Sequence, residues 1–267
     1  MTETESPRAT QAPLIVFTDL DGTLLDHHSY SWRAASPALA RLRKAGVPVI
    51  LASSKTATEI ALLRDQLGFG DCPAIVENGA GLLPAGAAPE VDLTQYRALR
   101  QALDQISPDL RQQFQGFGDW GTAGIADHTG LSLADAEKAG QRAFSEPGLW
   151  SGDAAGQARF IAALTKAGIT ARSGGRFLTL SFGGSKAEQM NNVLKLYTSP
   201  RSVALGDAPN DIEMLMRADI GIIVANPDHP PLAPLAGESG GRIRRTTLPG
   251  PAGWNDAMMA VMDEFGI

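Results

Sequence analysis

Short apolar runs alternate with helical patterns over both ends of the chain. Each run is rich in branched residues and ends in polar or small ones, which is typical of strands buried on both faces of a sheet. The runs cover residues 14–19, 47–54, 73–79, 202–207 and 220–225. Helical patterns cover residues 36–46, 56–68, 185–197 and 210–219. This alternation predicts an α/β fold with a Rossmann-like core built on a parallel sheet.

The segment from residue 88 to residue 183 breaks this rhythm. Amphipathic helical patterns occur at 93–106 and 132–144, and residues 176–182 alternate apolar and polar side chains as a half-exposed antiparallel strand does. We therefore expect an inserted α+β domain, here called the cap, over 88–183. The α/β core would comprise 13–87 and 184–267, and the polar residues 1–12 would form a disordered tail.

Composition and charge exclude several classes of protein. The net charge of −6 argues against nucleic acid as a partner, because phosphate backbones require clustered Lys and Arg. With Cys72 as the single cysteine, neither a disulfide framework nor a cysteine-based zinc site can form. No apolar run approaches the roughly 18 residues of a membrane-spanning helix. The default expectation is a soluble cytoplasmic protein that binds no membrane.

Polar side chains follow the expected strands at the edge of the sheet where open α/β folds bind their ligands. They are Asp19 and Asp21 after the first strand, Ser53, Ser54 and Lys55 before a helix, Lys186 at a helix start, and Asp207, Asn210 and Asp211 in the segment GDAPND. Residues two apart in extended backbone point the same way, so Asp19 and Asp21 would face one site. Free N–H groups at the helix start after Ser53 would bind an anion such as phosphate.

Crowded carboxylates become tolerable when a hard cation lies between them. Mg²⁺ takes oxygen ligands and shares them with a substrate phosphate, so Asp19, Asp21 and Asp207 are the expected ligands, with Asp211 behind them. Asp19 would attack phosphorus to form an aspartyl-phosphate, and Asp21 would protonate the leaving oxygen and later activate water. Ser53 would hold a phosphoryl oxygen, and Lys186 with Mg²⁺ would offset the charge repulsion.

Four features of the chain resemble, in their order, the four motifs of the haloacid dehalogenase superfamily. They are DLDGTL at 19–24, Ser53 at a strand end, Lys186, and GDAPND at 206–211. The cap resembles that of its Cof-like branch. Further segments resemble the mannosyl-3-phosphoglycerate phosphatases. They are TDLDGTLLD, SYSW, PVILASSKT, IVENGAGL, FSEPGLW and GGRF. This resemblance implies a phosphorylated glycerate glycoside as substrate, bound in part by Ser54, Lys55, Asn78, Asn210 and the cap arginines Arg142 and Arg176. Ser185 departs from the pattern, which has an acidic residue before the lysine.

Several alternatives stay open or are rejected at this point. Asn78-Gly79 could be a simple turn, and Asn210 and Asp211 could cap the helix that follows them. GFGDWG at 116–121 matches a dinucleotide fingerprint, which requires a strand before it and a helix after it; the polar residues before it argue against that context. A phosphatase of other sugar phosphates, a phosphomutase and a non-catalytic phosphosugar-binding protein remain alternatives, as does glucose in place of mannose in the substrate.

Overall fold

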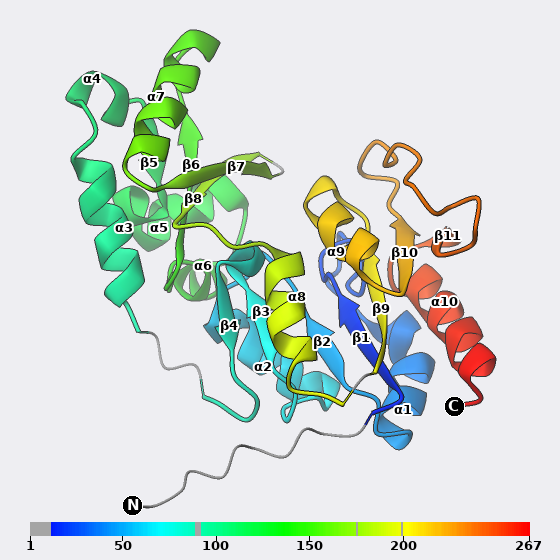
Figure 1. Cartoon of the computed structure of the whole chain (residues 1–267). Coiled ribbons are helices and arrows are strands. Elements are labelled where there is room, and N and C mark those ends of the chain that lie inside the picture. Colours follow the sequence, from blue (N-terminus) through cyan, green and yellow to red (C-terminus); the bar gives the residue numbers. More distant parts are fainter. Residues whose placement is uncertain (1–11, 89–91, 175, 199) are drawn as a thin grey trace, which may run out of the picture. The chain divides into compact units, whose positions relative to one another are not determined.

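The computed structural model describes residues 12–88, 92–174, 176–198 and 200–267. The chain divides into two compact units (Figure 1). Unit 1 comprises Met1–Leu51 and Ala187–Ile267, and unit 2 comprises Ala52–Lys186. The tail expected over residues 1–12 lies outside the described residues apart from Ala12, which is buried.

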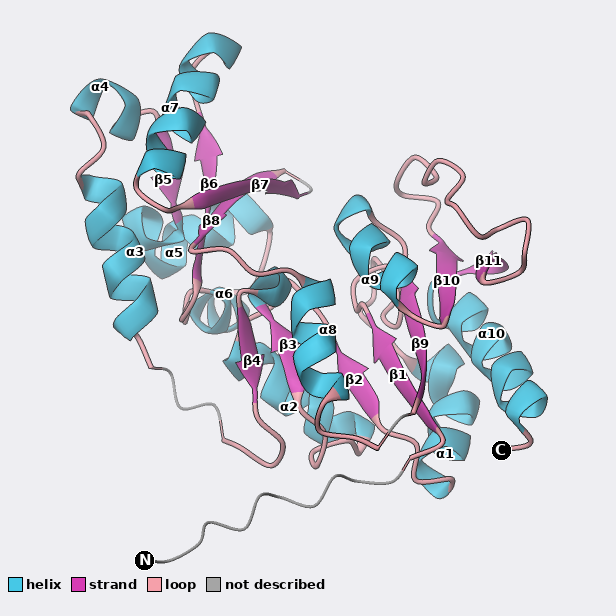
Figure 2. Cartoon of the chain, in the orientation of Figure 1, coloured by secondary structure: helices cyan, strands magenta, loops and turns pink. Residues whose placement is uncertain are grey.

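Unit 1 is built on a five-stranded sheet with the strand order β11-β10-β9-β1-β2, in which all neighbouring strands are parallel (Figure 2). The strands are β1 (Leu14–Thr18), β2 (Val49–Leu51), β9 (Arg201–Gly206), β10 (Ile220–Ala225) and β11 (Ile243–Pro249). All five residues of β1 are buried, because a central strand of a parallel sheet is covered on both faces. The parallel α/β sheet predicted from the alternating pattern is confirmed.

Unit 1 also contains helices, two of which pack against strands of this sheet and a third against the last helix. They are α1 (Ser36–Lys44), α8 (Lys186–Leu194), of which all but the first residue belongs to this unit, α9 (Ile212–Arg217) and α10 (Gly250–Phe265). The short 3₁₀ helices η1 (Arg33–Ala35) and η3 (Pro209–Asp211) precede α1 and α9. Trp254 of α10 is fully buried, and its indole Nε1 donates a hydrogen bond to Thr18 Oγ1 at 2.9 Å. This contact fixes the carboxyl end of β1.

The first part of unit 2 is a helix followed by a β-hairpin. The helix α2 (Ala57–Leu67) precedes β3 (Ala74–Val76) and β4 (Gly81–Leu83), which pair antiparallel around the 3₁₀ turn η2 (Glu77–Gly79). Ile75 of β3 also forms a parallel bridge with Ala52. The third predicted strand is thus present, but its ladder runs to β4, which the apolar pattern did not predict.

The remainder of unit 2 is a four-stranded antiparallel sheet with order β5-β6-β8-β7 and its helices (Figure 2). The strands are β5 (Phe114–Gly116), β6 (Ser145–Trp150), β7 (Thr170–Gly174) and β8 (Phe177–Ser181). The helices are α3 (Thr94–Asp104), α4 (Pro108–Arg111), α5 (Phe117–Thr129), α6 (Leu133–Ala139) and α7 (Ala154–Lys166). The antiparallel strand predicted near 176–182 is confirmed as β8.

Two details of unit 2 correct the sequence-based expectations. The helix expected over 132–144 ends at Ala139, because β6 begins only six residues later, at Ser145. A strand and a helix do flank the GFGDWG segment, since β5 ends at Gly116 and α5 begins at Phe117. β5 pairs antiparallel with β6, however, so the segment does not belong to the parallel βαβ unit that dinucleotide binding requires.

Residues 52–87 group with the inserted segment rather than with the parallel sheet of unit 1. Side-chain hydrogen bonds join α2 to the region of α6. Thr56 Oγ1 donates to the carbonyl oxygen of Lys138 at 3.0 Å, and Thr58 Oγ1 donates to Gln141 Oε1 at 2.8 Å. The compact units therefore divide at residues 51/52 and 186/187, whereas the pattern analysis placed the cap boundaries at 87/88 and 183/184.

Candidate functional site: buried carboxylates and an anchored turn

Three aspartates gather in unit 1 after the carboxyl ends of β1 and β9. Asp19, Asp207 and Asp211 each offer a carboxylate oxygen, and these oxygens all lie within 4.8 Å of one another. Their exposed fractions are 7%, 5% and 0%, respectively. Burying three carboxylates this close together is costly unless a cation or hydrogen-bond donors compensate their charge. The site thus has the properties of a site for a hard cation.

Neighbouring polar side chains fix the orientation of Asp207. Thr23 Oγ1 donates a hydrogen bond to its Oδ1, and Asn226 Nδ2 donates to its Oδ2 at 2.7 Å. Each carboxylate oxygen can accept more than one hydrogen bond or metal contact, so both oxygens retain coordination capacity. Thr23 lies in the loop after β1, and Asn226 directly follows β10, so three strand ends contribute to this cluster.

Asp211 reaches back toward the strand rather than forward into its own helix. Its Oδ2 accepts hydrogen bonds from the backbone N–H groups of Asp207 and Ala208, both at 3.1 Å. Although Asp211 is the N-cap residue of α9, its side chain makes no capping hydrogen bond there. Asp211 therefore caps the short helix η3, through the bond from Ala208, and at the same time orders the loop that carries Asp207. Asn210 lies beside it in η3 and is exposed.

The chain after β1 turns sharply. The strand ends at Thr18, a turn begins at Leu20, and the Leu25 N–H donates to the Leu20 carbonyl at 2.7 Å. A turn therefore lies between Asp19 and Asp21, so the extended backbone on which the expectation of a shared side depended is interrupted at Leu20. Asp21 is half-buried and lies outside the group of three close carboxylates.

Gly22 permits this turn to pass beside Asp207. Its φ of +83° is in the left-handed region, which side chains with a Cβ adopt only with strain. A Cβ built on Gly22 would lie 2.3 Å from Asn226 Nδ2 and 3.0 Å from Asp207 Oδ2. Both the conformation and the close approach therefore require glycine at this position.

The remaining residues predicted for the site belong to unit 2. Ser53 and Lys186 are buried, with exposed fractions of 1% and 2%. Ser54 is exposed, whereas Lys55 and Asn78 are partly buried. Thr56 caps α2 directly after these residues in a capping box with Glu59, so the backbone from Ser53 to Thr56 is held at a helix start, as expected.

The two cap arginines differ in their surroundings. Arg142 is 4% exposed, and its guanidinium contacts Glu77, Ser145 and the carbonyl of Ser54. Arg176 is exposed at the start of β8, donates to the carbonyl of His128 at 2.9 Å and lies over the ring of Phe177. Of the two, Arg176 keeps the accessibility that a contact with substrate requires.

Sequence reasoning assigned no role to Thr23 or Asn226, and it included Glu77 only as part of the segment IVENGAGL that carries the resemblance. Asn226 carries the same signal that identified the aspartates, because it is the first polar residue after the apolar run 220–225. Thr23 lies inside the DLDGTL motif itself. Apart from that resemblance, no local pattern indicated the role of Glu77, since its partners lie more than 60 residues away in the sequence.

A membrane-spanning role is not indicated by the helices. Across the described ranges, none of them combines the length and the apolar character needed to cross a bilayer.

The fold agrees with that of known proteins. Solved structures of similar fold include a phosphatase of the haloalkanoate superfamily from Bacteroides thetaiotaomicron, with 19% identity, coverage of 99% of both chains and a TM-score of 0.61. A subclass IIB sugar phosphatase shares 15% identity over 94% of this chain and 98% of its own, with a TM-score of 0.61. The sucrose-phosphatase of Synechocystis, solved with sucrose and phosphate, shares 16% identity over 95% of this chain and 98% of its own, with a TM-score of 0.58. At these identities the likeness establishes the shared fold.

The sequence itself matches the family model of the haloacid dehalogenase-like hydrolases over residues 16–113 and 156–231, more than half of the chain. The matched ranges include Asp19, Ser53, Lys186 and Asp207, the residues on which the motif resemblance depends. The chain therefore belongs to the haloacid dehalogenase-like hydrolase family.

Proposed function

We propose that this protein is a Mg²⁺-dependent phosphatase that hydrolyses a phosphomonoester through an aspartyl-phosphate on Asp19. The observation that carries this proposal is the group of three buried carboxylates, Asp19, Asp207 and Asp211, with oxygens within 4.8 Å of one another. A protein that had lost its chemistry would have no reason to retain this costly arrangement.

The donor set fits Mg²⁺. The three described carboxylates offer oxygen ligands, which Mg²⁺ prefers. Mg²⁺ is usually held by one or two carboxylates together with water and a substrate phosphate. Asp19 and Asp207 would hold the ion, with Asp21 close in sequence and Asp211 ordering the loop of Asp207. When bound, Mg²⁺ would neutralise the charge of the transferring phosphoryl group.

The side chains would divide the reaction between them. Asp19 attacks phosphorus as the bond from phosphorus to the leaving oxygen breaks, and Asp21 gives a proton to that oxygen. Asp21 then takes a proton from water, the resulting hydroxide attacks phosphorus, and the bond to Asp19 breaks to release inorganic phosphate. Ser53 holds a phosphoryl oxygen through its hydroxyl, and the ammonium group of Lys186 offsets negative charge. Water is the co-reactant, and no oxidant is required.

The proposed substrate is a phosphorylated sugar derivative, mannosyl-3-phosphoglycerate or its glucosyl analogue first. Support comes from the segments that resemble mannosyl-3-phosphoglycerate phosphatases and from the sugar phosphatase and sucrose-phosphatase among the structural neighbours. Residues 88–183 would act as the specificity cap. Within it, Arg176 would bind the glycerate carboxylate, because an exposed guanidinium can form paired hydrogen bonds with it. Ser54, Lys55, Asn78 and Asn210 remain proposed contacts of the substrate.

The test is phosphate release from a panel of phosphomonoesters, with Mg²⁺ and with EDTA. The panel contains mannosyl- and glucosyl-3-phosphoglycerate, 3-phosphoglycerate and several hexose phosphates. We expect Mg²⁺-dependent release, fastest from a glycosyl-phosphoglycerate. Activity confined to hexose phosphates would retain the phosphatase and refute the substrate. Phosphoryl transfer to a second sugar without free phosphate would indicate a mutase, and binding without turnover would refute an enzymatic role.

A further inference from the structure

The turn Glu77–Gly79 contacts both segments of unit 2 that carry candidate phosphate-binding residues. On one side, the Asn78 N–H donates to the Ser53 carbonyl at 2.8 Å, and the Glu77 N–H donates to the Lys55 carbonyl at 2.9 Å. On the other side, the turn lies directly against the backbone of residues 184–186. A Cβ on Gly79 would lie 2.4 Å from the backbone nitrogen of Lys186. The position of this turn therefore constrains both segments.

The backbone of the turn is strained. Glu77 and Asn78 have φ angles of +51° and +58°, two consecutive left-handed residues without glycine's freedom, and Gly79 follows at +90°. Each left-handed residue of this kind costs on the order of 1–2 kcal/mol, and such conformations persist only when surrounding contacts enforce them. The left-handed backbone of residues 77 and 78 therefore requires contacts that hold it.

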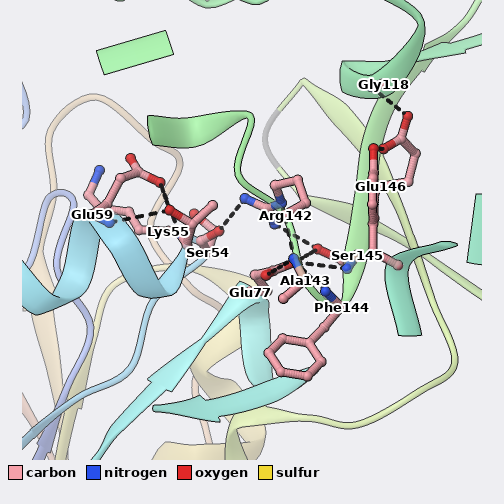
Figure 3. A network of polar contacts seen from close by, with 12 residues as sticks. Ser54, Lys55, Glu59, Glu77, Gly118, Arg142, Ala143, Phe144, Ser145 and Glu146 are labelled. Atoms are coloured by element: carbon pink, nitrogen blue, oxygen red, sulfur yellow. Dashed lines mark hydrogen bonds and ion pairs between the residues drawn. The ribbon is translucent and has the colours of Figure 1, made fainter. Parts of the chain in front are cut away.

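The side chain of Glu77 supplies those contacts (Figure 3). It is 1% exposed, and its Oε1 accepts a hydrogen bond from the Ala143 N–H at 2.9 Å. Its Oε2 accepts from the Phe144 N–H at 3.2 Å and from the N–H and the hydroxyl of Ser145 at 2.8 Å and 2.7 Å. Four donors on one stretch of chain therefore hold the carboxylate. Because the side chain is anchored in this way, the left-handed backbone of the turn is held in place.

Arg142 completes the cluster and extends it to Ser54. Its Nε lies 3.2 Å from Glu77 Oε2, and its guanidinium also donates to Ser145 Oγ at 2.6 Å and to the Ser54 carbonyl at 3.2 Å (Figure 3). The carbonyls of Ser53, Ser54 and Lys55 thus each accept a hydrogen bond from Asn78, Arg142 or Glu77. Three consecutive carbonyls are fixed by one buried cluster.

We propose that Glu77 and Arg142 are positioning residues for phosphate binding. Glu77 holds the turn that sets the backbone of Ser53 and Lys186, and Arg142 neutralises Glu77 and holds the carbonyl of Ser54. This inference rests on the proposed function for the roles of Ser53 and Lys186. It assigns Arg142 to the backbone at Ser54, in place of the substrate contact expected from the sequence. A misplacement of about 1 Å at such a site lowers catalysis about 10²-fold, so positioning has a measurable effect.

The test compares Glu77→Gln with a matched control, Glu146→Gln. Glu146 is the next residue of β6 after Ser145, is equally buried, and also pairs with an arginine, Arg100. Its side chain instead contacts Tyr96, Arg100 and the N–H of Gly118. Figure 3 shows it directed to Gly118 rather than to the turn. Both substitutions remove one buried charge from the same unit, but only one reaches residues 77–79.

The first readout is amide hydrogen exchange of the full chain. The probes are the amides of residues 77 and 78, which donate to the Lys55 and Ser53 carbonyls. In Glu77→Gln we expect these amides to exchange at least about tenfold faster, because the substitution weakens a charge-assisted hydrogen bond. Glu146→Gln should leave these amides within about twofold of the wild type. Unchanged exchange in Glu77→Gln, or equal acceleration in both variants, overturns the positioning role. If Glu77→Gln does not fold, Arg142→Lys is measured at the same amides.

The second readout is kinetic. With the best phosphomonoester of the panel, we expect KM and the inhibition constant of inorganic phosphate to rise about tenfold in Glu77→Gln, and kcat to fall as well. Simple destabilisation lowers kcat by reducing the active fraction and leaves KM unchanged, so a kcat loss alone overturns the inference. If the wild type hydrolyses no phosphomonoester, the proposed function fails, whereas the exchange experiment still decides whether Glu77 holds the turn against residues 53–55.

Discussion

Substituting Gly22 with alanine tests how closely the loop after β1 is fitted to the carboxylate cluster. Gly22 has a φ of +83°, and an added methyl group would lie 2.3 Å from Asn226 Nδ2, closer than real Cβ contacts. The chain offers a matched control in the same unit. Gly46 has a φ of +67°, but a Cβ there would have nothing within 4 Å. Gly46→Ala therefore measures backbone strain alone, and Gly22→Ala measures strain plus crowding.

The two contributions can be estimated separately. Left-handed backbone at a residue with a Cβ costs about 1–2 kcal/mol, which is the whole effect expected for Gly46→Ala. Overpacking a filled site adds about 1–3 kcal/mol, so Gly22→Ala should lose about 2–5 kcal/mol in all. The clash falls on the amide that donates to Asp207, so the methyl group would also disturb the orientation of that carboxylate.

Urea unfolding of both variants measures the stability difference, and titration calorimetry measures Mg²⁺ affinity. We expect Gly22→Ala to be the less stable variant by at least about 1 kcal/mol and to bind Mg²⁺ more weakly than Gly46→Ala, which should bind it as the wild type does. Equal stabilities would show that the loop relaxes away from Asn226 without cost. Lower stability with unchanged Mg²⁺ affinity would refute the coupling between Gly22 and the orientation of Asp207.

Three further predictions follow from individual contacts. Asp19→Asn should abolish phosphate release while circular dichroism and urea unfolding show an intact fold; comparable turnover in that variant would refute the nucleophile. Burial raises the pKa of Asp219, but hydrogen bonds from the N–H and hydroxyl of Ser202 outweigh it and lower the pKa below its ordinary 3.8. The wild type should therefore have a larger free energy of unfolding than Asp219→Asn at pH 7. This difference should be retained above pH 3.8 and shrink as the pH falls below it. A difference in urea unfolding that does not change with pH would contradict this expectation. Thr56→Ala removes the N-cap of α2 and should cost about 1–2 kcal/mol, whereas the exposed Thr165→Ala should be nearly neutral in the same unfolding assay.

The sequence alone predicts the parallel sheet and much of the site because both depend on local pattern. Apolar runs of strand length ending in Asp19, Ser53 and Asp207 are visible without any structure, and parallel strands place their carboxyl ends at one edge. The structure confirms the strands and brings Asp19 and Asp207 together. Asn226 follows from the same rule and could have been found with it.

Other features depend on contacts that no local pattern encodes. The turn at Leu20, which lies between Asp19 and Asp21 in the sequence, is fixed by hydrogen bonds within the loop and by the passage of Gly22 beside Asn226. The left-handed backbone of Glu77 is held by donors at residues 143–145. In sequence, both segments resemble ordinary turns. The contacts that select their conformations come from other parts of the chain, so a local pattern does not reveal them.

The buried carboxylates of the two units are oriented by different sets of donors. Glu77 faces the guanidinium of Arg142 as well as backbone N–H groups, so its charge is compensated within the protein. Asp207 is oriented by a hydroxyl and an amide, and Asp211 by two backbone N–H groups. These hydroxyl, amide and backbone N–H donors fix the direction of the carboxylates. Carboxylates that are ordered in this way, with oxygens within 4.8 Å of one another, offer the ligands that a hard cation takes, which is the condition for binding Mg²⁺ and a phosphate together.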